Sequence, residues 1–308
     1  MKHISVLLDE SIDGLQIKPG DTIIDGTLGG GGHTLEIIRR FGKKVRIICL
    51  DLDIDAIFRT KKLIGATTSN LIFKTVGFQD IDKVLDDLNI TKVNRILLDL
   101  GLSSFQLEVS GRGFSFLKNE PLLMTMKKPA RPLEGAGGNP SDEDLTARKI
   151  VNAWDEEMLA DIIYGFGEER YSRKIAKGIV DARKEKKIET TFDLVKIIDE
   201  IVGKNYRGLR IHPATRTFQA LRIATNSELS NLKQVIQKGF SRLSAGGRMA
   251  IITFHSLEDR IVKKAFKELK IKGHAVVITK KPIVPKPEEI KLNPRSRSAK
   301  LRLIEKIL

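Results

Sequence analysis

The sequence predicts an α/β fold in which a parallel, doubly wound sheet is interrupted by an all-helical domain. Short apolar runs alternate with stretches of helical spacing over the first hundred residues. After Gly101 this alternation stops, and a stretch without period and then helical patterns follow as far as residue 212, with no strand candidate. A helix, a glycine turn and further apolar runs then resume the first pattern. Such alternation is typical of parallel sheets whose crossovers are helices.

Four apolar runs are the expected strands of the first third. They cover residues 22–25, 45–51, 71–76 and 95–99. The segments between them have helical spacing, over residues 34–41, 54–64 and 81–88. The runs are apolar along their whole length rather than at alternate positions, so we expect both faces of these strands to be buried.

The middle third contains no strand candidate. Residues 111–139 are rich in Gly, Pro and Lys and show no period. Ser141, with Asp144 three positions on, has the pattern of a helix start. Further helical patterns cover residues 154–164, 168–186 and 191–202.

The last third returns to the α/β pattern. It predicts a helix at 228–243, a turn at 245–247, a strand at 248–254 and closing strands at 275–279 and 300–305. We therefore expect a discontinuous α/β domain of residues 1–105 and 213–308. It encloses a helical domain of residues 106–212, which is a candidate for substrate recognition.

The net charge of +15 is concentrated near the C-terminus. Residues 260–308 carry 15 Lys and Arg against 4 Asp and Glu, a net +11. Such a density favours binding to a polyanion through phosphate neutralisation and counterion release. Nucleic acid is therefore the expected partner, and a solvated basic surface without a partner is the alternative.

The sequence lacks the features of a membrane or secreted protein. No apolar run approaches the roughly 20 residues that cross a bilayer, and residues 1–11 lack the apolar stretch of a signal peptide. Cys49 is the only cysteine, which excludes an intrachain disulfide and a cysteine metal cage. We expect a cytoplasmic protein with no membrane partner.

A glycine-rich turn, Asp25 to His33, lies between the first expected strand and helix. Glycines let the backbone turn tightly and approach a ligand closely. The dinucleotide fingerprint G-x-G-x-x-G fails, because Thr34 occupies its third glycine position when counted from Gly29. No Gly-Lys-Ser/Thr completes a phosphate-binding P-loop. The turn alone is compatible with a nucleotide-like ligand or with a flexible loop.

Three residues stand near the carboxyl ends of later strands, where open α/β sheets bind ligands. Asp51 comes 22 residues after Gly29, and its carboxylate can accept hydrogen bonds from ribose hydroxyls. Phe78 follows the third strand and either flanks an adenine or packs in the core. Asp99 ends the fourth strand. Asp53 is the expected N-cap of the next helix.

Four residues are candidates for catalysis: Asp99, Ser103, Ser104 and His255. If the nucleic acid accepts a group on a nucleobase amine, that amine is a weak nucleophile, because its lone pair is delocalised into the ring. Hydrogen-bond acceptors on its N–H groups would localise the lone pair. A hydrolase triad around His255 is disfavoured, because near neighbours rarely assemble one and no G-x-S-x-G elbow exists. We expect no metal, and we interpret His33, His212 and His255 as buried hydrogen-bonding histidines.

Several segments resemble known methyltransferases. The turn from Asp25 to Gly31 is similar to the acid-x-Gly-x-Gly-x-Gly turn of class I methyltransferases, with Thr27 at the first glycine. Segments in family order resemble the RsmH/MraW family of ribosomal small-subunit RNA (cytosine-N4)-methyltransferases. They are residues 25–33, 98–104, 112–116 (RGFSF), 164–169, 212–220 (HPATRTFQA), 254–260 (FHSLEDR) and 293–298 (NPRSRS).

The resemblance implies a Rossmann-like class I methyltransferase sheet with an inserted helical domain. It implies transfer of a methyl group from S-adenosylmethionine to N4 of a cytidine in the decoding centre of 16S ribosomal RNA. The partner is then 16S rRNA or the small ribosomal subunit, bound by a monomer or a homodimer. The matching cofactor contacts are Gly31, Gly32, His33, Asp51, Phe78, Asp99 and Gln106. The RNA-binding candidates are Arg112, Arg216, Arg222, Arg295 and Arg297.

One segment departs from the family. Where the family usually has Pro-Leu-Asp-Met-Arg-Met, residues 121–126 have Leu123 and Thr125 in place of the acid and the arginine. An RNA-binding or ribosome assembly factor of the same fold, with weakened catalysis, is therefore the alternative to an active enzyme. An NAD-dependent oxidoreductase is a third hypothesis, which the failed fingerprint disfavours.

Overall fold

The chain folds into two compact units. We call Met1–Ser103 together with Leu229–Leu308 the α/β unit, and Ser104–Glu228 the helical unit. The structure is a computed structural model that describes residues 4–65, 70–127, 145–208 and 211–307.

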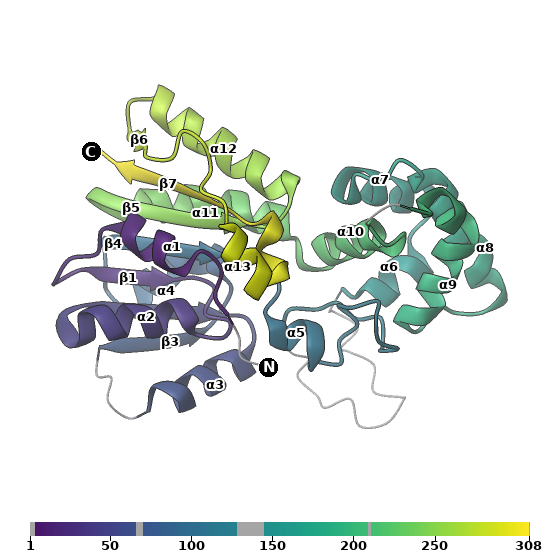
Figure 1. Cartoon of the computed structure of the whole chain (residues 1–308), viewed down its shortest axis with the longest axis horizontal. Coiled ribbons are helices and arrows are strands. Elements are labelled where there is room, and N and C mark those ends of the chain that lie inside the picture. The colour runs from purple at the N-terminus through teal and green to yellow at the C-terminus, as the bar shows by residue number, and fades with distance from the viewer. Residues whose placement is uncertain (1–3, 66–69, 128–144, 209–210, 308) are drawn as a thin grey trace. The chain divides into compact units, whose positions relative to one another are not determined.

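The α/β unit contains a seven-stranded sheet in the order β3-β2-β1-β4-β5-β7-β6 (Figure 1). Its strands are β1 (Thr22–Asp25), β2 (Arg46–Asp51), β3 (Leu71–Thr75), β4 (Val93–Asp99), β5 (Leu243–Thr253), β6 (Ala275–Val277) and β7 (Lys300–Lys306). The first five strands pair in parallel, and β7 runs antiparallel to β5 and β6. The predicted α/β sheet is confirmed. Its order reverses between β1 and β4, which is where doubly wound sheets bind ligands.

Helices cover both faces of this sheet (Figure 1). Those on one face are α1 (Leu8–Leu15), α2 (Gly32–Phe41) and α3 (Ile54–Ile64). Those on the other are α4 (Ile81–Asp87), α11 (Glu228–Arg242) and α12 (Ser256–Ile271). Ile23 packs in the hydrophobic core under α1, α2 and α3, and Ile24 packs in the core under α4, α11 and α12. Both faces of β1 are thus buried, as its continuous apolar run predicts.

The remaining elements of the α/β unit are short. They are α13 (Pro287–Leu292) and the 3-10 helices η1 (Gly42–Lys44), η2 (Phe78–Asp80) and η4 (Pro294–Ser298). α1, α12 and α13 have no counterpart among the predicted elements. The predicted turn at 245–247 lies inside β5, where the pairing with β4 shifts register between Val93 and Arg95.

The helical unit extends further along the chain than predicted, to Glu228 rather than 212. Its helices are α5 (Ser104–Glu108), α6 (Ala147–Ala153), α7 (Glu156–Gly167), α8 (Ser172–Glu185), α9 (Thr191–Val202), η3 (Gly203–Tyr206) and α10 (Ala214–Asn226). α10 belongs here because it packs tightly on α7. The Gln219 amide donates to the Phe166 carbonyl (2.9 Å), and a Cβ on Gly167 would lie 2.6 Å from the Arg216 carbonyl oxygen.

The expected helix start at Ser141 and Asp144 lies outside the described residues. Across the described ranges, no helix combines the length and the apolar character that crossing a membrane requires.

Candidate functional site

The glycine turn after β1 is bonded to both neighbouring strands. The Gly26 N–H donates to the Leu97 carbonyl of β4 (2.9 Å), and the Leu28 N–H donates to the Leu50 carbonyl of β2 (3.0 Å). The turn therefore lies at the sheet edge where the carboxyl ends of β1, β2 and β4 meet.

The position of Gly31 requires glycine for two reasons, a left-handed backbone and the absence of a Cβ. Its φ is +76°, in the left-handed region that side chains rarely adopt. A Cβ at this position would lie 2.6 Å from Thr60 Cγ2 on α3. α2 begins at the next residue, Gly32, so its first N–H groups face the same edge of the sheet. The turn is thus a shaped backbone cradle and not a flexible loop.

Asp25 anchors the turn from inside. It is buried and accepts hydrogen bonds from the Thr34 hydroxyl (2.6 Å) and from the Thr27 N–H (3.2 Å). Burial raises its pKa, and the two hydrogen bonds oppose that shift. The role of Asp25 is therefore to hold the turn.

Thr27 has a role that the sequence analysis missed. Its hydroxyl oxygen accepts a hydrogen bond from the Asp99 N–H (2.6 Å), which ties the turn to the end of β4. A glycine, which the family pattern of class I methyltransferases has here, could not make this bond. The signal in the sequence was Thr27 itself, which has a hydroxyl where the class I methyltransferase pattern has a glycine.

Asp51 faces the turn from the end of β2. Its two carboxylate oxygens accept hydrogen bonds from the Gly29 N–H (2.7 Å) and the Asp53 N–H (2.8 Å). Burial is the main cause that raises its pKa to about 6, against the lowering effect of these bonds. Asp53 accepts from the Asp55 N–H (3.0 Å) at the start of α3, so its predicted N-cap role is confirmed.

Asp99 is the least satisfied carboxylate of the site. Its Oδ2 lies 3.8 Å from Nδ1 of buried His33, whereas its Oδ1 is buried with no hydrogen-bond partner among the described residues. Burial, then the charges of Asp25 and Glu258, raise its pKa well above the usual range. A buried acceptor without a donor is costly, so this oxygen marks a place where a ligand can donate.

These residues fit a cofactor that carries positive charge and hydroxyl groups. Asp25, Asp51 and Asp99 put three carboxyl groups around one turn, and the positive-φ glycines leave room for a ligand against the backbone. S-adenosylmethionine has a sulfonium, an ammonium and two ribose hydroxyls. These hydrogen-bond acceptors therefore match S-adenosylmethionine better than they would match an anionic ligand.

Phe78 and Ser103 lie beside this turn. A Cβ on Gly26 would be 3.4 Å from Phe78 Cβ, and one on Gly29 would be 3.9 Å from Ser103 Cβ. Phe78 is half-buried and packs against the core, which is one of its two predicted roles, whereas a contact with adenine stays a prediction. Ser104 and Gln106 belong to α5 of the helical unit, where Gln106 is buried.

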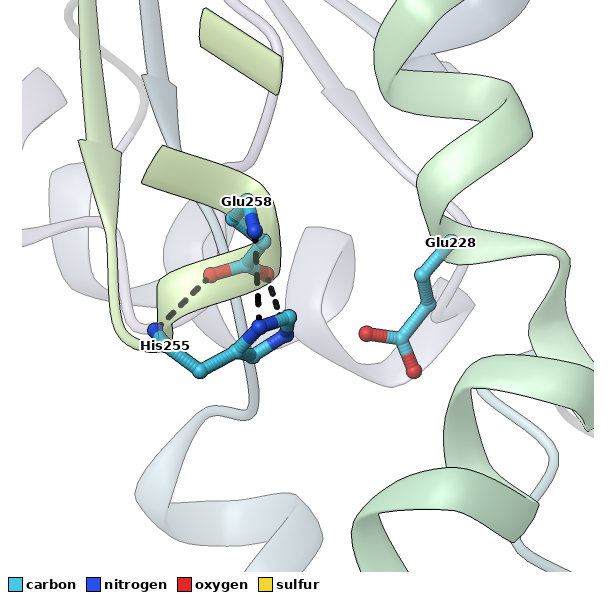
Figure 2. Close-up of side chains that lie close together, drawn as sticks. All are labelled: Glu228, His255 and Glu258. Carbon is cyan, nitrogen blue, oxygen red and sulfur yellow. Dashed lines mark hydrogen bonds and ion pairs between the residues drawn. The ribbon is translucent and has the colours of Figure 1, made fainter. Parts of the chain in front are cut away.

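His255 forms the N-cap of α12 (Figure 2). Its Nδ1 accepts from the Glu258 N–H (3.4 Å), and a Glu258 carboxylate oxygen accepts from the His255 N–H (3.3 Å). The second ring nitrogen lies 3.3 Å from the other oxygen of Glu258. This capping box gives His255 a structural role, and its catalytic role stays a prediction.

The predicted RNA-binding arginines occupy different environments. Arg112 is buried and donates to the carbonyls of residues 125 and 126 (3.1 and 2.7 Å). Arg222 forms a bidentate pair with Glu228 (2.8 Å for both bonds), and Arg216 donates to the Glu168 carbonyl (2.9 Å). The exposed members are Arg295 and Arg297, both in η4. Binding to RNA stays a prediction for all five.

Leu123 and Thr125, where the sequence departs from the family, are both buried within the helical unit. The left-handed backbone at Met124 (φ +55°) lies between them, and the Asn226 amide donates to the Met124 carbonyl (2.8 Å). A single charge at either position would be buried, which is costly unless it is paired. The loss of both charges together avoids that cost.

The chain is similar to a known family of methylases over almost its whole length. The model of the MraW methylase family matches residues 1–307. The chain is 44% identical over 321 residues to ribosomal RNA small subunit methyltransferase H of Clostridium botulinum (strain Kyoto / Type A2), covering 99% of each protein. It is 41% identical over 320 residues to the protein of the same name in Clostridioides difficile (strain 630), again covering 99% of each. A solved rRNA methylase from Streptococcus thermophilus resembles the fold with a TM-score of 0.44 at 11% identity, covering 100% of both chains.

Proposed function

Since the chain belongs to the MraW methylase family, whose methyl donor is S-adenosylmethionine, we propose that it methylates N4 of a cytidine in the decoding centre of 16S ribosomal RNA. The observation that carries this proposal is the match to small-subunit rRNA methyltransferases over 99% of the chain. The carboxyl groups around the turn after β1 supply hydrogen-bond acceptors for the hydroxyl and N–H groups of the cofactor.

Residues of the turn and of the neighbouring strand ends hold the cofactor. The Asp51 carboxylate accepts from the ribose hydroxyls, and the cradle around Gly31 receives the ligand against the backbone. The unsatisfied Asp99 Oδ1 accepts from an N–H group, His33 lies near the other oxygen of this carboxyl group, and Phe78 flanks the adenine. When bound, S-adenosylmethionine supplies a methyl group on a positively charged sulfur. Gln106 is the remaining family-matched contact.

The acceptor amine must be made a better nucleophile. The lone pair of cytidine N4 is delocalised into the ring, and hydrogen-bond acceptors on its N–H groups localise the pair and take up developing positive charge. Asp99 and Ser103 are the candidates that the α/β unit provides at the turn. N4 loses one proton as it gains the methyl group, and that proton can leave to water.

Nucleoside mass spectrometry tests the reaction. Small-subunit RNA is incubated with the protein and S-adenosylmethionine, with free 16S RNA and assembled subunits as parallel substrates. We expect N4-methylcytidine, and we expect Asp99→Ala to remove it. The proposal fails if no N4-methylcytidine forms under conditions in which a control methyltransferase is active.

An RNA-binding assembly factor with weakened catalysis is the second candidate. The uncharged, buried Leu123 and Thr125 favour it, because the family has an acid and an arginine there. Retained binding of S-adenosylmethionine and RNA without turnover would select this candidate over the enzyme.

Affinity for S-adenosylmethionine is expected to fall as the pH is lowered through about 6, the pKa of Asp51. Above this pKa the ionised carboxylate accepts hydrogen bonds and attracts a cation. Below it the carboxyl group is neutral, accepts hydrogen bonds more weakly and no longer attracts a cation. One such group changes affinity by at most about tenfold per pH unit. Isothermal titration from pH 5 to 8 measures this. Asp51→Asn should bind more weakly with a flatter profile, whereas the exposed Asp86→Asn should behave as wild type. A flat wild-type profile would contradict the assignment.

The lysines of α12 are expected to contribute to RNA binding. Leu257, Val262 and Phe266 of this helix are buried, whereas its exposed lysines are Lys263, Lys264, Lys267 and Lys270. Replacing these four by glutamine should reduce the salt slope of RNA affinity by up to about 3 to 4, since each phosphate contact contributes roughly 0.7 to 0.9.

The matched control replaces four exposed lysines elsewhere in the same unit: Lys43, Lys44, Lys61 and Lys62. It changes the net charge by the same amount. Fluorescence anisotropy over a salt series gives both slopes. An equal reduction in the two variants would show an effect of total charge alone and would refute a docking role for α12.

A further inference from the structure

Two motifs that the proposed reaction leaves unused meet inside the helical unit. Phe116 ends the RGFSF segment, and His212 begins the HPATRTFQA segment. Their rings stack with centroids 4.7 Å apart and planes inclined by 15°. Phe218 of α10 supports Phe116 edge-on at 5.5 Å and is itself buried. The three rings thus form one aromatic cluster, in which Phe116 and His212 stack and the buried Phe218 supports them.

His212 is the outer ring of this stack, and it is exposed. The expectation that it is a buried histidine is therefore wrong. Its orientation is nevertheless fixed, because Nδ1 accepts a hydrogen bond from the Ala214 N–H (3.2 Å) while the ring rests on Phe116. An exposed ring that is already held in place loses little further entropy when a planar ligand stacks on it.

Cations lie along the same stretch of chain. Lys204 and Arg207 are exposed on the segment that leads to His212. Proteins that bind single-stranded nucleic acid combine aromatic surfaces, on which bases stack, with cations that neutralise phosphates, and the helical unit has residues of both kinds here.

We propose that the Phe116–His212 stack is a base-stacking site for an unpaired nucleotide of the RNA substrate. The proposal rests on the proposed function for the identity of the ligand as RNA. The helical unit would then contact a base of the RNA as well as its phosphates.

Two substitutions at one position separate this role from simple capping of α10. His212→Asn keeps an acceptor for the Ala214 N–H but removes the ring. His212→Phe keeps a ring but removes the acceptor. If the ring stacks on a base, His212→Asn should weaken binding of a 12-nucleotide single-stranded RNA by roughly 5- to 100-fold, and His212→Phe should stay within about twofold of wild type. If His212 only caps the helix, His212→Phe should instead be the damaged variant, with a lower melting temperature.

The probe can be varied as well as the protein. An RNA of the same length with abasic sites keeps the phosphates but offers no base, so wild type and His212→Asn should bind it equally. The salt slope should be unchanged in His212→Asn, because stacking releases no counterions. Phe58→Ala, which removes an exposed ring from α3 of the α/β unit, is the control and should bind as wild type.

The proposal is overturned if His212→Asn binds the RNA as wild type does, or if Phe58→Ala loses as much affinity. Normal binding to RNA with impaired binding to assembled subunits would also overturn it, since the stack would then contact a ribosomal protein. Binding is measured without turnover, so the two proposals can fail separately. Absent N4-methylcytidine with ring-dependent RNA binding refutes only the reaction, whereas normal methylation with ring-independent binding refutes only the stacking site.

Discussion

Gly31→Ala should weaken binding of S-adenosylmethionine by at least about tenfold, which corresponds to about 1.4 kcal/mol or more. The new Cβ would lie 2.6 Å from Thr60 Cγ2, so either α3 or the turn must move. The backbone at φ +76° adds a cost of about 1–2 kcal/mol for any L side chain. Both effects act on the cradle that faces the ligand. Isothermal titration measures the affinity, and thermal unfolding measures the loss of stability.

A second glycine separates the steric effect from the backbone effect. Gly20 has a φ of +90°, and a Cβ on this residue would meet no atom of the described residues within 4 Å, so Gly20→Ala carries the strain without the contact. It should lower the melting temperature while leaving cofactor affinity unchanged. Thr60→Ala in the Gly31→Ala background should restore part of the affinity, because it removes the methyl group that the new Cβ meets. Unchanged affinity in Gly31→Ala would show that the ligand does not approach this turn.

Arg95→Ala should lower the free energy of unfolding by about 3–5 kcal/mol, the cost of removing one partner of a buried ion pair. The side chains of Arg95 and Asp21 are 6% and 9% exposed, and Arg95 Nε lies 3.2 Å from Asp21 Oδ2. Arg95 also donates to the carbonyls of Asn94, Gly246 and Gln16 (2.9, 3.2 and 2.9 Å). Its loss leaves the buried Asp21 carboxylate with the Lys18 N–H as a donor (2.8 Å) but without a positive charge beside it, and it removes a donor from three carbonyls. Urea unfolding measures the change.

An exposed arginine provides the comparison. Arg39 pairs with Glu36 but is 71% exposed, so Arg39→Ala should change stability by no more than about 1 kcal/mol. Replacing both members of the buried pair, as Arg95→Met with Asp21→Asn, should cost less than Arg95→Met alone because no unpaired charge remains. An equal loss from Arg95→Ala and Arg39→Ala would contradict the importance given to burial.

Most strands and many helices could be predicted because their signals are local. The apolar runs at 22–25, 71–76 and 95–99 became β1, β3 and β4 with bounds shifted by two residues or fewer. α12 was missed although Val262 and Phe266 are four residues apart, as on one face of a helix, and both are buried. Its N-cap is a histidine rather than the usual Ser, Thr, Asp or Asn, so the start signal was absent.

The end of the helical unit depended on contacts that have no local signal. α10 has a helical pattern that suits either unit. It joins the helical unit because Gly167 lets it approach α7 closely and because Gln219 donates to Phe166. Neither contact can be read from the periodicity of α10 itself.

The sequence by itself determined the α/β class, the family and the positions of Asp25, Asp51 and Asp99 at strand ends. Strand periodicity and the glycine turn depend on neighbouring residues, so they can be read along the chain. Only the tertiary structure decided which side chains meet: the Thr27 hydroxyl with the Asp99 N–H, and the ring of Phe116 with that of His212. These contacts join residues far apart in the sequence, and their geometry is set by the packing of whole elements and not by local preference.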